Sequence, residues 1–187
     1  MVGQVIFVLL FRFFNMKFMK TPHFILLAVF GLIMASCRLT GDAESTPEIY
    51  LKAMRIAGKD TTYLHFMGNV LDTIRVGDTI TFRTDVYSQY NNLLQYKITS
   101  SREKSVEFIW SDIDESLGTL FTSETDYDKG LFVMPGTFSH LYFPFKYIAK
   151  EDEKNLTITF SILNDASRNY NSISTTIVTP IKAAKKE

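Results

Sequence analysis

Cys37 is the only cysteine in the sequence and the side chain best suited to covalent chemistry. A single cysteine cannot form a disulfide within the chain, so its thiol is free for modification or for a partner chain. The small residues Ala35 and Ser36 precede it, and before them an apolar run covers residues 24–34, with two lysines further upstream. This order of basic, apolar and small residues is typical of a secretory signal peptide. The run is shorter than the roughly 20 apolar residues that a membrane-spanning helix needs.

The four residues that end this segment, Met34, Ala35, Ser36 and Cys37, resemble the lipobox of bacterial lipoproteins. The resemblance implies that a signal peptide of residues 1–36 is removed and that the sulfur of Cys37 receives a diacylglyceryl group. Membrane lipid would then hold the chain through the acylated cysteine, since each buried CH₂ contributes about 0.8 kcal/mol. We therefore expect a lipid-anchored protein of the cell envelope, in the outer membrane.

The remaining organisation follows from composition. Residues 1–15 contain a second apolar stretch, and we expect them to be an upstream extension, with translation beginning at Met16 or Met19. Residues 37–48 are small, polar and rich in turn-forming types, which predicts a lipidated tether. Residues 49–187 are long enough to bury a stable core without metals or disulfides, and we expect them to form one domain.

A cluster of tyrosine and amide side chains offers the best candidate for ligand binding. Tyr87, Tyr90, Asn91 and Asn92 lie within six residues and are expected in a loop between two strands. Tyrosine rings supply contact area and amides supply hydrogen bonds, a combination typical of recognition loops. The sequence therefore predicts contact with a protein or a glycan at this loop.

Acidic residues at alternate positions offer a second candidate. Carboxylates spaced in this way in loops suit calcium, which takes six to eight oxygen ligands. No EF-hand spacing is present, so the alternative is a set of solvated loop acids. No other metal or cofactor is indicated. The candidate calcium ligands are Asp112, Asp114, Glu115, Asp126 and Asp128.

Catalytic signatures are missing from the sequence after Cys37. The only histidines there are His65 and His140, and neither lies in a nucleophile or zinc motif. Residues 38–187 carry 17 basic and 20 acidic residues, because three of the 20 basic residues lie before Cys37 and no acidic residue does. This slightly acidic balance argues against binding nucleic acid, which needs a clustered positive surface. We expect a protein that is not an enzyme.

Period-2 alternation of apolar and polar residues dominates the sequence after residue 49 and predicts strands. Turn-forming residues separate the alternating runs, which is the pattern of an antiparallel β-sandwich. No run shows a convincing helical period, and residues 49–58 are the best candidate for a helix. The predicted strands cover residues 78–84, 94–100, 106–110, 140–148, 156–162 and 174–181.

Two of these segments resemble parts of bacterial Ig-like domains. Residues 75–82, Arg-Val-Gly-Asp-Thr-Ile-Thr-Phe, are similar to the entry into their second strand, and residues 159–174 are similar to their last hairpin. Together with the lipobox, the chain resembles small Bacteroidetes lipoproteins with a single Ig-like domain. The resemblance implies an all-β, Ig-like sandwich located in the cell envelope, and it implies no activity. From the residues themselves, we expect a non-catalytic envelope protein that binds a protein or glycan partner. The alternatives are a glycan-binding accessory of a polysaccharide-uptake system and an enzyme of unrecognised type.

Overall fold

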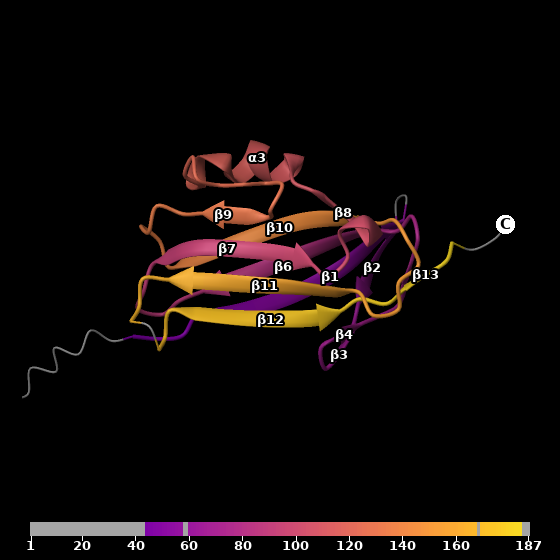
Figure 1. The fold of residues 1–187 in the computed structure, drawn as a ribbon, viewed down its shortest axis with the longest axis horizontal. Coiled ribbons are helices and arrows are strands. Elements are labelled where there is room, and N and C mark those ends of the chain that lie inside the picture. The colour runs from indigo at the N-terminus through magenta and orange to yellow at the C-terminus, as the bar shows by residue number, and fades with distance from the viewer. Residues whose placement is uncertain (1–43, 58–59, 168, 185–187) are drawn as a thin grey trace, which may run out of the picture. The chain divides into compact units, whose positions relative to one another are not determined.

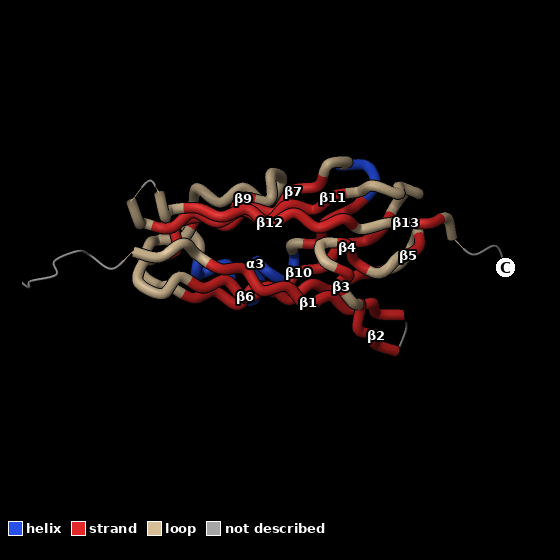
Figure 2. The backbone as a smooth tube through the Cα atoms, turned by 90° about the horizontal axis from the view of Figure 1, so that it is seen from below, coloured by secondary structure: helices blue, strands red, loops and turns tan. Residues whose placement is uncertain are grey.

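The architecture comes from a computed structural model, which describes residues 44–57, 60–167 and 169–184. All of these residues belong to one compact unit, Ala43–Glu187. Two β-sheets lie face to face in this unit and form a β-sandwich (Figure 2). The domain is therefore mostly β, as the alternation predicts.

The first sheet has five antiparallel strands in the order β2-β1-β6-β10-β8. β6 is its central strand and pairs along nearly its whole length with β1 on one side and β10 on the other (Figure 1). The strand bounds are β1 Glu48–Ala57, β2 Asp60–Leu64, β6 Thr79–Tyr87, β8 Val106–Ile109 and β10 His140–Ala149.

The second sheet has six strands in the order β3-β4-β12-β11-β7-β9. Its pairs are antiparallel except β4 with β12, which run parallel and share a single residue pair. A short parallel pair, β5 with β13, lies at one end of the sandwich. The bounds are β3 Phe66–Met67, β4 Val70–Leu71, β5 Ile74–Arg75, β7 Leu93–Ser100, β9 Leu131–Val133, β11 Thr157–Asn164, β12 Ser172–Val178 and β13 Ile181–Lys182.

Alternation explains why these segments are strands. In β11 the side chains of Ile158, Phe160 and Ile162 are buried, while Thr159 and Ser161 between them face outward. Successive side chains of a strand point to opposite faces, so this pattern gives one apolar face to the core. All six predicted strands are confirmed, as β6, β7, β8, β10, β11 and β12. The last predicted run is divided at Pro180, which cannot donate a ladder hydrogen bond, and β13 follows it.

Aromatic rings fill the space between the sheets. Phe82 of β6 stacks on Phe145 at 5.3 Å between ring centroids and lies 5.8 Å from both Tyr147 and Phe160. All four side chains are at most 2% exposed. Each fully buried large apolar side chain contributes roughly 1.5–3 kcal/mol, so this cluster stabilises the contact between the two sheets.

Two expectations about helices are wrong. Residues 49–58, the best helix candidate, contain most of strand β1, because pairing with both β2 and β6 satisfies its backbone. The structure instead has a helix, α3 Ser111–Leu117, followed directly by a short 3₁₀ turn at Gly118–Leu120. Another 3₁₀ turn, Glu103–Ser105, precedes β8. α3 follows β8 at the edge of the sandwich (Figure 1) and buries Ile113 completely. Its seven residues are too few to show a helical period in the sequence.

Candidate binding surface

A cluster of exposed aromatic and acidic side chains occupies the outer surface of the first sheet, near the start of β1. Strand register sets it out in two rows, with Glu48, Tyr87 and His140 side by side in one and Tyr50, Asp85 and Tyr142 in the next. These six residues are called the tyrosine face. They alternate along their strands with buried residues such as Val86 and Leu141, which turns all six away from the core.

The three rings of the tyrosine face are open to solvent. Tyr50 is 58% exposed, Tyr142 is 48% exposed and Tyr87 is 41% exposed. An aromatic side chain buries a large area when it binds a partner, and scattered single exposures are ordinary on a protein surface. Three such rings on three adjacent strands form a contiguous patch, which is the arrangement expected of a recognition surface.

Polar and aromatic contacts link several side chains of the tyrosine face. His140 Nε2 contacts Asp85 Oδ1, and the imidazole lies edge-on to the Tyr87 ring at 6.2 Å between centroids. The Tyr50 hydroxyl donates a hydrogen bond to a carboxylate oxygen of Glu48. That hydrogen bond, together with the negative charge of Glu48, raises the pKa of Tyr50 above its ordinary value. The face therefore combines aromatic surface with carboxylate acceptors and one imidazole.

The four residues predicted to form a binding loop have different roles in the structure. Tyr87 ends β6 and belongs to the tyrosine face, and Tyr90 is exposed with its hydroxyl accepting a hydrogen bond from Gln89 at 2.9 Å. Asn91 accepts a hydrogen bond from the Ser45 amide at 3.2 Å. Asn92 bonds through its backbone amide and its side-chain amide to the carboxylate of Asp165, at 2.9 and 3.1 Å. Both asparagines thus link this loop to neighbouring segments.

Two of the predicted calcium ligands, Asp112 and Asp126, pair with lysines. Lys146 Nζ lies 2.6 Å from Asp112 Oδ2 and lowers the pKa of that carboxyl through the hydrogen bond. Lys129 does the same for Asp126, also at 2.6 Å. Asp128 lines a recess described below, and the side chains of Asp114 and Glu115 lie outside the described part. Within residues 44–57, 60–167 and 169–184, no three His, Cys, Asp or Glu side chains gather closely enough to hold a metal ion.

A recess of about 470 Å³ opens between β7 and β8, beside residues 127–130. Phe108 and Trp110 stack at 5.0 Å along its wall, and Lys97 and Asp128 line it as well. Trp110 also packs on Phe132 at 5.2 Å, so the stacked rings belong mainly to the core. Packing accounts for the aromatic wall of this recess, and Asp128 is the one residue predicted for a site that lines it.

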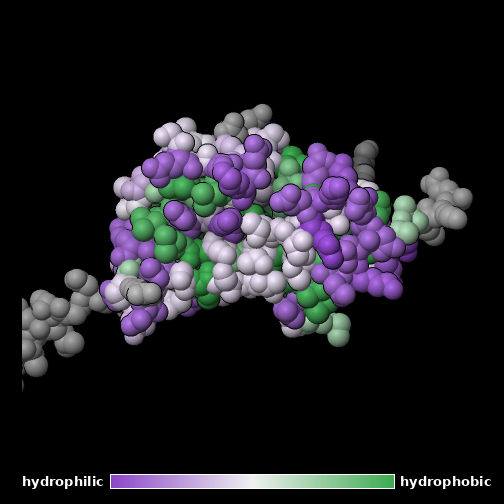
Figure 3. All heavy atoms as spheres, in the orientation of Figure 1, coloured by the Kyte–Doolittle hydropathy of each residue, from purple (hydrophilic) through white to green (hydrophobic). Residues whose placement is uncertain are grey.

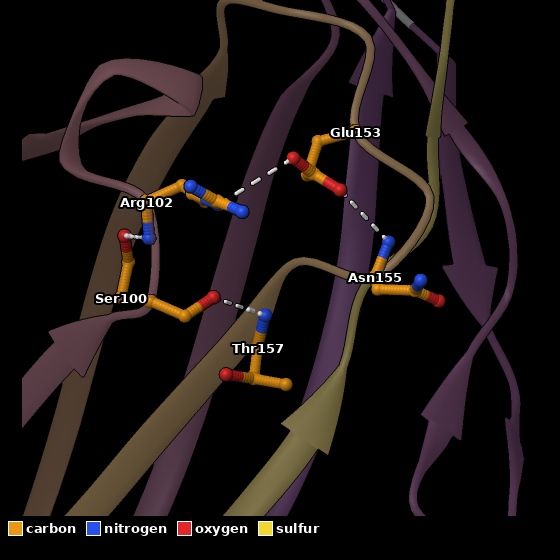
Figure 4. A network of polar contacts seen from close by, with 6 residues as sticks. Ser100, Arg102, Glu153, Asn155 and Thr157 are labelled. Atoms are coloured by element: carbon orange, nitrogen blue, oxygen red, sulfur yellow. Dashed lines mark hydrogen bonds and ion pairs between the residues drawn. The ribbon is translucent and has the colours of Figure 1, made fainter.

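A neighbouring polar recess of about 530 Å³ lies at the turn after β7. Figure 4 shows its contacts: Arg102 faces Glu153 at 3.7 Å and donates its backbone amide to the Ser100 hydroxyl at 3.2 Å. Glu153 in turn accepts from the Asn155 amide at 3.2 Å. These bonds join the turn after β7 to the turn before β11, which explains the cluster as a structural link.

Two other groups of predicted site residues are the lipobox and the histidines. Met34, Ala35, Ser36 and Cys37 lie outside the described residues. His65 is exposed and lies 3.5 Å from Asp72. In the part of the chain that the structure describes, no helix has the length and apolar character needed to cross a bilayer.

The chain matches no protein-family model and no curated protein sequence. Function must therefore be argued from the tyrosine face and the sequence motifs.

Proposed function

We propose that this protein is a lipid-anchored, non-catalytic lipoprotein of the outer membrane, and that its Ig-like domain binds a glycan through the tyrosine face. The observation that carries the glycan assignment is the grouping of Tyr50, Tyr87 and Tyr142 around Asp85 on one exposed sheet surface. The anchor rests on the lipobox-like residues that end in Cys37.

The strand order supports an Ig-like assignment. Immunoglobulin-type sandwiches have strands A, B, E and D in one sheet and C, F and G in the other. Here β1-β6-β10-β8 and β7-β11-β12 occupy the same neighbour positions and follow the same order along the chain. This domain has further strands beyond these seven, among them β2 beside β1 and β4 beside β12. Another, β9, is inserted between the fourth and fifth of the seven and pairs with β7.

The start of the described chain supports anchoring at the same end as the tyrosine face. Glu44 accepts hydrogen bonds from the amide and hydroxyl of Ser167, and the Ser45 carbonyl accepts one from Asn164 at 3.1 Å. These contacts fix the chain to the sandwich four residues before β1. Residues 38–43 then separate Glu44 from Cys37, and six extended residues span at most roughly 20 Å. A lipid on Cys37 would therefore hold the tyrosine face close to the bilayer.

Sugars suit the chemistry of this face. Their C–H surfaces pack on aromatic rings, and their hydroxyls donate to carboxylates such as Asp85 and Glu48. Tyr50 and Tyr142 lie on the two strands that flank β6, so their backbones are roughly 10 Å apart, comparable to the length of a disaccharide. The face is open to solvent, whereas catalysis generally requires exclusion of water, and this favours binding over turnover.

A glycan array probed with the full chain in detergent tests this proposal. Tyr50→Ala and Tyr142→Ala should each weaken binding about tenfold, equivalent to roughly 1.4 kcal/mol, because each removes one stacking ring. Tyr63→Ala is the matched control, since Tyr63 is 63% exposed on the same sheet but lies outside the tyrosine face. Equal binding by all three variants would contradict the proposal. Capture of a stoichiometric protein through the same tyrosines, with no glycan bound, would replace the glycan by a protein partner.

A further inference from the structure

Strand β12 forms an open edge of the second sheet. Its other neighbour, β4, meets it only at Val178, whose amide donates to the Asn69 carbonyl at 2.8 Å. Figure 2 views the molecule from this side, with β12 running along it. The stretch from Ser172 to Thr176 is therefore paired with β11 alone among the described strands.

Hydrogen-bond alternation shows which groups face this open edge. Asn171 and Thr179 bond toward β11, through the Asn171 carbonyl and the Thr179 amide, each at 2.8 Å. In an antiparallel pair, alternate residues bond to one neighbour and the residues between them point to the other side. The even-numbered residues Ser172, Ser174 and Thr176 therefore direct their backbone N–H and C=O groups away from β11.

β12 also lacks the devices that usually protect an edge strand. Charged side chains, proline and bulges block further pairing in natural sheets. The sequence Ser-Ile-Ser-Thr-Thr-Ile-Val of β12 contains no charge and no proline, and its pairing with β11 is regular throughout. The other outer strands are shorter, and β9 is covered by the Thr122 amide, which donates to Val133 O at 2.8 Å.

We propose that β12 is a self-association edge, at which two copies of this chain pair antiparallel about a two-fold axis at Ser174. This inference is independent of the proposed function, because the tyrosine face lies on the other sheet. Main-chain pairing at a sheet edge is a common mode of recognition. The two second sheets would merge into one continuous sheet, with Ser174 opposite Ser174 and Ser172 opposite Thr176.

The hydroxyl side chains argue for a second copy as the partner. Within one molecule, the hydroxyls of Ser161 and Ser174 share a hydrogen bond at 2.6 Å, and those of Thr159 and Thr176 share one at 3.0 Å. In the proposed pair, hydroxyls again meet hydroxyls, so the ladder continues across the two-fold axis. Figure 3 shows a pale band, neither strongly polar nor apolar, at the centre of the face where β11 and β12 lie in Figure 1.

The two ends of the free edge fit the same register. Pairing about Ser174 places residue 170 of one copy opposite Val178 of the other, where the β3–β4 hairpin begins. That hairpin exposes Met67 at 81% and Val70 at 37%, and Tyr170 is 46% exposed. Tyr170 of each copy would therefore cover the exposed apolar residues of the other copy's hairpin.

Cysteine cross-linking in native membranes tests the register. The two Ser174 residues would form a hydrogen-bonded pair across the two-fold axis. The Cα atoms of such a pair lie about 5.5 Å apart, within the 4.4–6.8 Å Cα–Cα range for a disulfide. Ser174→Cys in the full chain should give a dimer on oxidation in non-reducing gels. Ser161→Cys, the matched control on the same face one strand inward, should stay monomeric, as should the unsubstituted chain. Cross-linking at both positions, or at neither, would overturn the proposal.

A charge placed at the edge gives a second measurement. Ser174→Lys would set two ammonium groups opposite each other in the pair, while its exposed position leaves the monomer fold intact. Light scattering of the detergent-extracted protein should then show half the mass of the unsubstituted protein. Ser161→Lys should keep the dimer mass, and circular dichroism checks that both variants are folded. An unchanged mass for Ser174→Lys, or a monomeric unsubstituted protein, would contradict pairing through β12.

Discussion

Glu48 and Tyr50 are two residues apart on β1, and their contact determines how the tyrosine face responds to alkaline pH. The hydrogen bond to Glu48 and the carboxylate charge favour the neutral phenol, so the pKa of Tyr50 is raised from its ordinary value of 10.0. A raised pKa means that any stability from this contact is present below about pH 10. It is lost as the pH rises through the folded-state pKa.

Glu48→Gln should therefore lower the pKa of Tyr50 toward its ordinary value, because the carboxylate charge is removed. Following the Tyr50 ring resonance by NMR during a pH titration measures the shift directly. Glu107→Gln is the control, since Glu107 pairs with Lys150 on the same sheet, outside the tyrosine face. A Tyr50 titration unaffected by Glu48→Gln would show that this contact does not set the pKa.

Only part of the tyrosine face could be predicted at the level of residues. Tyr87 was found because it lies beside other polar and aromatic loop residues. His140 and Tyr142 could have been found, because in the predicted strand 140–148 they alternate with Leu141 and Phe143, which places them outward. Tyr50 could not, because residues 49–58 had no clear strand assignment. The grouping itself depends on pairing between strands that are distant in sequence, which local patterns do not specify.

Elements with strict alternation were predictable, whereas short or mixed elements were not. β11 carries an apolar residue at every second position, and β6 does so except at Thr84; one face of each is buried. β1 is less regular, because Arg55 occupies an inward position opposite Ile80, and pairing decides its structure. α3 follows β8, and its acidic residues are equally typical of a loop. Strands of two or three residues, such as β4 and β9, depend on their neighbours and leave no local signal.

The loop before β9 depends on one glycine. Gly130 has φ +59, a left-handed conformation, and a Cβ built there would lie 2.2 Å from the Ile98 backbone oxygen. Gly130→Ala should therefore lower the free energy of unfolding by about 2–4 kcal/mol, from left-handed strain and a clash that the backbone cannot avoid. Urea unfolding of the purified protein measures this loss.

Gly68→Ala provides the matched comparison for this loop. Gly68 has a similar φ of +64, but a Cβ there would meet no atom within 4 Å. It should cost only about 1 kcal/mol, the strain of the left-handed conformation alone. Equal losses for the two variants would show that close packing against β7 is not what requires Gly130.

At the scale of the whole molecule, the two outer surfaces of the sandwich have different characters. The first sheet carries the tyrosine face near the start of the described chain, and the second sheet carries the neutral Ser and Thr surface that ends at β12. The described chain begins at one end of the sandwich and ends at the other (Figure 1). A lipid joined at Cys37 would thus place the aromatic residues at the membrane-proximal end.

The claim on which this arrangement depends is that the domain is held by lipid at Cys37. Intact-mass spectrometry of the protein extracted from native membranes tests it most directly. We expect a chain that begins at Cys37 and carries the added mass of a diacylglyceryl group, while Cys37→Ala should be unmodified and leave the membrane fraction. A native chain with an unmodified Cys37, or one that retains the residues before it, would contradict the account.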